Sequence, residues 1–248
     1  MPGQTLSQSP EAPLDDQPVS PLNPLPMVVW ALVLPMIAME VVLSAGEGGL
    51  VGGATAIGWR LEAVQRFGFS PQYMRQMIEV WQFPLDGLTR LVTYPVVSMS
   101  STTTLFVVVI TLALGKFVGE VFRWWAILIL FFAATVLGAL AYAAVPGTAM
   151  PLLGGYPGVY GLIGGFTYVL WRRQKLMGQS QIRAFRLIGF LLVFRMVFGI
   201  GSVLIYGPQA GTGFDWVAEL AGFGVGFVLS FAVSPGGWAS LLERIRAR

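Results

Sequence analysis

Long apolar runs separated by short polar segments dominate this chain. Each run is close to the ~20 consecutive apolar residues that a helix needs to cross the hydrocarbon core of a bilayer. The pattern therefore predicts an all-α polytopic membrane protein, a bundle of membrane-spanning helices. Six runs carry this prediction, at residues 27–45, 95–115, 124–144, 154–170, 187–206 and 216–234.

Three other stretches flank or interrupt these runs. Residues 1–26 are rich in Pro, Gln and Ser, a composition that predicts a disordered tail. Residues 46–93 mix charged and aromatic side chains at irregular spacing, which is typical of a partly helical segment lying in the membrane interface. Residues 236–248 are basic and predict a second short tail. We therefore expect one membrane domain, residues 27–235, between two tails.

Composition supports this interpretation. Hydrophobic residues make up 55% of the chain and charged residues 11%, against roughly a quarter charged in a soluble domain. Although the pI is near 9.4, the basic residues lie in short segments beside apolar runs. That arrangement is typical of topology signals, so we expect the lipid bilayer and not a nucleic acid as surroundings.

The basic residues also predict an orientation. They are concentrated at Lys116, at Arg123, between residues 172 and 186, and in the C-terminal tail. By the positive-inside rule this places both termini in the cytoplasm, as in an integral protein of the bacterial inner membrane. The segment 46–93 is the discordant one, because it is then external despite its four arginines.

Two residue types are missing from the sequence. The chain has no cysteine and no histidine. Thiolate nucleophiles, Ser-His dyads and the usual ligands of zinc and haem are thereby excluded. We expect no metal and no cofactor.

Glycines concentrate in two of the apolar runs. Residues 154–165 contain six glycines, and Gly222 and Gly226 lie one turn apart in the last run. Inside a bilayer, small residues allow helix backbones to approach closely. We expect the helices at 154–170 and 216–234 to touch each other. The helix-packing residues are Gly155, Gly158, Gly161, Gly164, Gly222 and Gly226.

Three segments resemble the rhomboid intramembrane proteases. Residues 90–97, Arg-Leu-Val-Thr-Tyr-Pro-Val-Val, resemble the family's Trp-Arg-Leu-Leu-Thr-Tyr-Pro-Phe-Val-His. Residues 160–164 resemble the aromatic-Gly-Leu-Leu-Gly that follows the catalytic serine, and residues 218–226 resemble Ala-His-x-x-Gly-x-x-x-Gly. The resemblance implies a six-transmembrane-helix rhomboid-like bundle.

The same alignment implies that the family's chemical groups are absent. The serine position falls at Tyr156 or at Pro157, depending on register, and the histidine position falls at Glu219. We therefore expect no catalytic residue and a rhomboid pseudoprotease. The two histidines and the asparagine of the family's second helix fall at Ser98, Thr103 and Val107, or, one residue further on, at Met99, Thr104 and Val108.

Four polar side chains within the apolar runs are candidates for a functional role, and three of them are charged: Glu40, Tyr156, Arg195 and Glu219. A charge there needs a partner or water. If Tyr156 is at the serine position, it faces Glu219 and the two form a charge-assisted hydrogen bond. The competing register leaves Glu219 to Arg195, to Glu40 or to water, and Arg195 free to snorkel toward the headgroups.

Three functions compete at this point. The first is a non-enzymatic protein that binds transmembrane segments of another membrane protein and affects their stability, folding or assembly, which the resemblance to inactive rhomboids and Derlins implies. The second is an intramembrane serine-type protease with non-standard groups, such as Ser98 or Ser100 with Glu219 as base. The third is a transporter or channel that uses Glu40, Arg195 and Glu219 as a relay.

Overall fold

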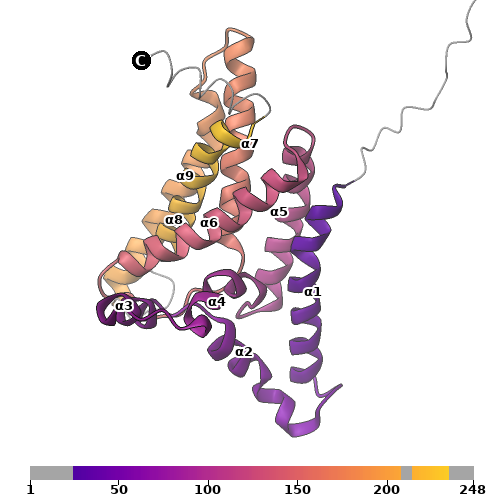
Figure 1. Ribbon diagram of the computed structural model, residues 1–248, viewed down its shortest axis with the longest axis vertical. Helices are drawn as coiled ribbons and strands as arrows, with labels where there is room; N and C mark the ends of the chain where they lie inside the picture. Colours follow the sequence, from indigo (N-terminus) through magenta and orange to yellow (C-terminus); the bar gives the residue numbers. More distant parts are fainter. Residues whose placement is uncertain (1–24, 208–213, 235–248) are drawn as a thin grey trace, which may run out of the picture.

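The computed structural model describes residues 25–207 and 214–234, and within these ranges the chain is helical, without strands (Figure 1). The expected tails, 1–26 and 236–248, lie outside the described residues except for Leu25 and Pro26. The helices in chain order are α1 (Met27–Glu47), η1 (Gly53–Gly58), α2 (Trp59–Phe67), α3 (Pro71–Val80), α4 (Leu85–Thr93), η2 (Tyr94–Val96), α5 (Ser101–Gly119), α6 (Trp124–Ala144), α7 (Tyr156–Leu176), α8 (Arg183–Tyr206) and α9 (Asp215–Val233).

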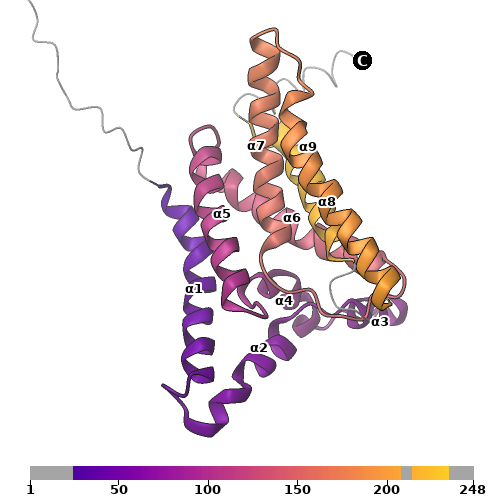
Figure 2. The same ribbon diagram turned by 180° about the vertical axis from the view of Figure 1, so that it is seen from behind.

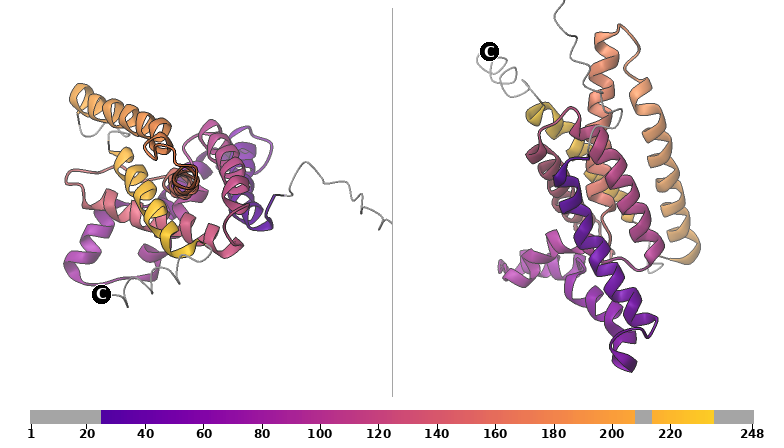
Figure 3. Two further views of the ribbon diagram at one scale, coloured as in Figure 1. Left: turned by 90° about the horizontal axis from the view of Figure 1, so that it is seen from above. Right: turned by 90° about the vertical axis from the view of Figure 1, so that its right-hand side faces the viewer.

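Five of these helices, α1, α5, α6, α8 and α9, are long and apolar enough to cross a membrane. Helix α7 is also 21 residues long, but its glycines and the basic residues Arg173 and Lys175 in its last turn make it less apolar. It lies within the bundle, seen nearly end on in the left view of Figure 3. The chain is thus an all-α polytopic membrane protein with α7 as the sixth long helix.

Helix α7 packs mainly against α9 and α6, while α1 lies beside α5 (Figures 1 and 2). The main core forms between these helices from apolar side chains such as Val33, Ile127, Leu130, Phe131 and Leu162, each exposed by 1% or less. Helix α8 lies at the edge of the bundle (Figure 3). The protein therefore consists of a tight central group of helices and one peripheral helix.

Helices α2, α3 and α4 lie together at one end of the bundle (Figure 1). An isolated antiparallel bridge between Phe69 and Leu152 joins this segment to the loop before α7. Arg75 donates hydrogen bonds to the carbonyl oxygens of Ala143, at 3.2 Å, and Val145, at 3.0 Å. It thereby satisfies carbonyls left free at the C-terminal end of α6.

The predicted start of the second long helix is wrong. The run from residue 95 was expected to be helical throughout, but α5 begins only at Ser101. Pro95 belongs to the short turn η2, and Val97 is extended. The hydroxyl of Ser100 accepts a hydrogen bond from the backbone N–H of Thr103, which is the arrangement of a helix N-cap.

Candidate functional site

Two charged side chains meet between the peripheral helix and the bundle. Arg195 of α8 donates from Nε to Oε2 of Glu219 at 2.9 Å, and its second nitrogen donates to Oε1. Glu219 is 2% exposed, while the side chain of Arg195 is 40% exposed. The pair is bidentate, the strongest geometry for a guanidinium and a carboxylate. Both oxygens of Glu219 are therefore engaged.

Tyr156 takes a different place from the one expected for it. Within the described residues no hydrogen bond joins Tyr156 to Glu219, whose oxygens accept from Arg195 instead. The ring of Tyr156 lies beneath the guanidinium, with its centroid 6.0 Å from Cζ of Arg195. At this distance the contact is a cation–π interaction at the limit of its range. The competing pairing, Glu219 with Arg195, is the one that the structure has.

Tyr156 and Pro157, the two candidates for the family serine position, form the first turn of α7. Both line a cavity of about 20 Å³, together with Arg195, Asp215 and Glu219. A cavity needs at least ~10–15 Å³ to hold one water molecule. This cavity therefore admits about one water molecule.

Ser98, Thr103 and Val107 come together around the glycines that precede α7. A β-carbon on Gly154 would lie 3.4 Å from Oγ of Ser98 and 3.8 Å from Cγ2 of Thr103. One on Gly155 would lie 2.9 Å from Cγ1 of Val107. The family register with Ser98, Thr103 and Val107 thus places three residues beside the start of α7, but the third is an aliphatic side chain that donates no hydrogen bond.

The glycines singled out in the sequence lie at helix contacts. A β-carbon on Gly222 would overlap the carbonyl oxygen of Pro157, and one on Gly226 would overlap that of Gly161. On the α7 side, a β-carbon on Gly164 would overlap the backbone of Phe223. Helices α7 and α9 therefore touch backbone to backbone. Gly158 and Gly161 face α6, where added β-carbons would meet Phe131 and Ala134, and Gly155 faces Val107 and Met36.

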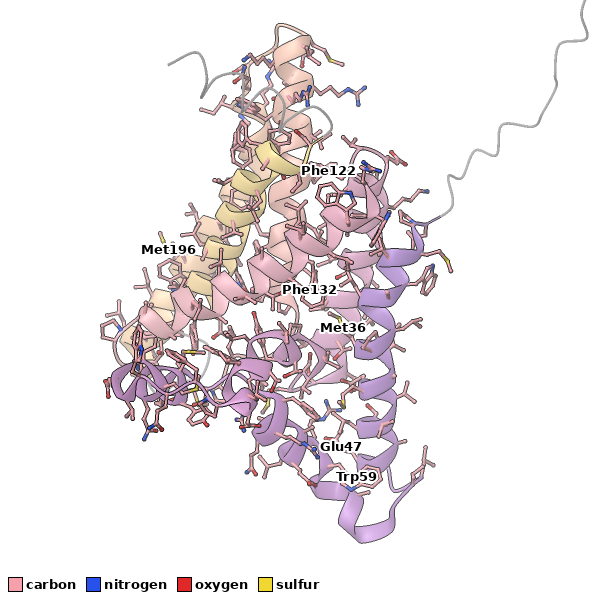
Figure 4. The ribbon with its side chains drawn as sticks, in the orientation of Figure 1. Met36, Glu47, Trp59, Phe122, Phe132 and Met196 are labelled. Carbon is pink, nitrogen blue, oxygen red and sulfur yellow. The ribbon has the colours of Figure 1, made fainter. Side chains whose placement is uncertain are left out.

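A second charged cluster lies at the other side of the bundle, around Glu40 of α1. Arg60 of α2 donates to Oε1 of Glu40 at 2.7 Å and to Oε1 of Glu47 at 2.6 Å. It also donates to the carbonyl oxygen of Ser98 at 2.9 Å. Figure 4 shows Glu47 beside Trp59, the residue that precedes Arg60, where α2 meets the end of α1. These bonds raise the pKa of Arg60, so its guanidinium stays charged.

The carboxylate of Glu40 also accepts hydrogen bonds from three hydroxyls. Oε1 accepts from Ser44 at 2.8 Å and from Ser101 at 2.7 Å, and Oε2 accepts from Thr104 at 2.8 Å. Ser101 is the first residue of α5, whose positive N-terminal end favours a negative charge nearby. Glu40 is thus fully satisfied where α1, α2 and α5 meet. The sequence did not reveal Arg60 as its partner, because 20 residues separate them.

The relay hypothesis needed Glu40 and the pair Arg195–Glu219 to act together. The structure assigns them to two separate clusters: Glu40 bonds residues of α1, α2 and α5, and Glu219 bonds Arg195 of α8. Among the described residues no group of three or more His, Cys, Asp or Glu side chains is arranged to hold a metal ion. The intramembrane charges therefore join different helices in two separate parts of the fold.

Comparison with known proteins identifies one family. The family model described as Rhomboid domain matches residues 85–236, more than half of the chain. This range includes α5 to α9, the contacts between α7 and α9, and the pair Arg195–Glu219. A search of curated proteins found no match.

Proposed function

This chain belongs to the rhomboid family, and we propose that it is a non-enzymatic member, a pseudoprotease that binds transmembrane segments of another membrane protein and affects their stability, folding or assembly. The observation that carries the proposal is the bidentate pair Arg195–Glu219. By the resemblance of residues 218–226 to the family's sequence pattern, Glu219 takes the position of the catalytic histidine, and here its carboxylate binds Arg195 and joins α9 to α8.

Acyl transfer by a serine needs a nucleophile next to a base and donors for the oxyanion. Pro157 has no hydroxyl, and Tyr156 lies under a guanidinium. Glu219 as a base would first have to leave Arg195. The cavity of about 20 Å³ beside these residues admits about one water molecule. These features support a scaffold that has kept the family's packing and lost its chemistry.

The remaining candidates for a nucleophile are Ser98 and Ser100, and both take part in contacts that stabilise the fold. The hydroxyl of Ser100 caps α5 and lies 2.9 Å from Oγ1 of Thr103. Ser98 is 3% exposed, and its carbonyl oxygen accepts a hydrogen bond from Arg60. Neither arrangement activates a hydroxyl.

Helix α8 is the proposed docking surface for a partner segment. Only 11% of the most apolar 18-residue stretch of α8 is buried in the protein. The corresponding share is 33% for α1, α5 and α9 and 56% for α6. Its outer face carries Phe190, Phe194 and Phe198, exposed by 70%, 50% and 63%. Their rings lie 6.4 Å and 4.4 Å apart in succession. A row of aromatic rings offers a large contact area to a neighbouring helix.

We also propose the orientation with both termini in the cytoplasm and the bacterial inner membrane as location. Supporting this, Lys116 in the last turn of α5, Arg123 before α6 and the basic end of α7 lie at the same end of the bundle (Figure 1). Positive charges on one side are typical of the cytoplasmic side.

The proposal is tested by quantitative proteomics of membranes from cells with and without the protein, including mapping of protein termini. We expect the abundance or half-life of one or a few integral membrane proteins to change, without new termini inside their transmembrane segments. Wild-type protein and the control Val109→Ala, on the exposed face of α5, should restore the levels, whereas Phe194→Ala with Phe198→Ala should not. New intramembrane termini would contradict the proposal, and so would unchanged levels of all membrane proteins.

A further inference from the structure

A groove runs between α1 and α5, away from the pair Arg195–Glu219. Its volume is about 520 Å³, within the ~300–1,000 Å³ of typical ligand sites. Ile37 and Val41 of α1 form one wall, and Leu105 and Val108 of α5 form the other. Val41 and Leu105 are exposed by 61% and 62%, so the groove opens toward the surroundings of the bundle.

One end of this groove is polar. Glu40 and Thr102 line it there, next to the first turn of α5. Helix α5 has 19 residues, about 28 Å at 1.5 Å per residue, which matches the ~30 Å hydrocarbon core. Its first turn therefore lies at the level where hydrocarbon meets headgroups. The groove is apolar on the hydrocarbon side of that level and polar at it.

The charged cluster beside this polar end, formed by Glu40, Glu47 and Arg60, carries an excess negative charge. Glu40 and Glu47 both bind Arg60, and two carboxylates against one guanidinium leave one negative charge uncompensated. The side chain of Glu47 is 41% exposed, so this charge is accessible from the headgroup region. A cationic hydrogen-bond donor is the complementary group.

The length of the groove distinguishes between occupants. From Ser101 to Val108 the lining of α5 extends over eight residues, whose seven steps of ~1.5 Å span about 10 Å. A helix has a diameter of ~10–12 Å and would contact this groove over two turns at most. An extended acyl chain with a headgroup at its end follows the groove and places its polar part beside Glu40.

From these observations we propose that the groove between α1 and α5 is a binding site for a phospholipid with a primary ammonium headgroup, whose acyl chain packs between Val41 and Leu105 and whose ammonium lies near Glu40 and Glu47. The inference does not depend on the proposed function, because it involves neither α8 nor the residues Tyr156, Pro157 and Glu219.

The test is native mass spectrometry of the full chain in mild detergent with added phosphatidylethanolamine or phosphatidylglycerol. We expect one phosphatidylethanolamine to bind in preference to phosphatidylglycerol. Leu105→Trp should fill the groove and abolish this binding, and Val41→Trp should do the same from the other wall. The matched control is Val109→Trp, since Val109 is 51% exposed on the same helix and does not line the groove. It should bind lipid as the wild type does.

A charge variant tests the headgroup. Glu47→Gln removes the excess negative charge and should reduce the preference for phosphatidylethanolamine about fivefold, the equivalent of the ~1 kcal/mol typical of one charge at a membrane surface. The proposal would be overturned if the wild type bound the two lipids equally. It would also be overturned if neither tryptophan variant changed lipid binding, because the bound lipid would then be annular lipid only. If the bound mass is instead that of a second copy of this chain or of another protein, and Leu105→Trp removes it, the lipid proposal is overturned as well.

Discussion

The guanidinium of Arg195 on α8 binds both carboxylate oxygens of Glu219 on α9, and this contact joins the peripheral helix to the centre of the bundle. Helix α8 is also held near its start, where Phe185 packs on Phe227 with ring centroids 5.2 Å apart. The carboxylate of Glu219 is therefore a structural group of this protein.

Removing one member of the pair should destabilise the protein. We expect Glu219→Gln and Arg195→Met each to lower the free energy of unfolding by about 2 kcal/mol, less than the ~3–5 kcal/mol of a fully buried pair, because Arg195 is 40% exposed at its side chain. Arg195→Met combined with Glu219→Gln should cost less than the sum of the two single losses, because no charge is left without its partner. A double-mutant cycle by thermal unfolding in detergent measures this, and additive effects would refute the coupling.

Replacing Tyr156 by phenylalanine should have almost no effect. The ring that faces Arg195 remains, and in the described structure the hydroxyl makes no hydrogen bond to Glu219. The expected change in the free energy of unfolding is within ~0.5 kcal/mol. The same thermal assay checks this, and a loss equal to that of Glu219→Gln would instead favour the Tyr156–Glu219 pairing expected from the sequence.

The glycines of α9 allow a comparison between two positions that touch α7 and one position that does not. Gly222→Leu and Gly226→Leu should prevent accumulation of folded protein, because a side chain at either position overlaps the backbone of α7. The cost exceeds the ~4–5 kcal/mol of exceptional single mutations. Gly224→Leu is the matched control on the same helix, since a β-carbon there meets nothing within 4 Å. Comparable yields of all three variants in size-exclusion chromatography would show that α7 and α9 do not touch.

Arg60 should tolerate no replacement, not even by lysine. A single ammonium cannot reach Glu40, Glu47 and the carbonyl of Ser98 together, whereas the guanidinium does. We expect Arg60→Lys to lower the free energy of unfolding by about 2 kcal/mol and to speed proteolysis within residues 46–93. Arg66→Lys, at an exposed position of the same helix, should change neither quantity, and equal behaviour of both variants would exclude a role for the cluster.

The sequence predicted the parts of this fold that depend on composition. Apolar runs located the long helices, with 124–144 coinciding with α6, and the spacing of Gly222 and Gly226 indicated the face that meets α7. The start of α5 was missed because the capping role of Ser100 depends on the extended backbone before it. Side-chain partners were harder to predict from the sequence. Whether Glu219 meets Tyr156 or Arg195 depends on the rotation of three helices about their axes.

Fluorophosphonate labelling in proteoliposomes tests most directly whether this rhomboid lacks an activated serine, because these reagents need an activated serine to react. The protein should show no more labelling than the variant Ser98→Ala with Ser100→Ala, while an active serine hydrolase added to the same vesicles is labelled. Labelling of the wild type that disappears in that variant would show that the protein has an activated serine.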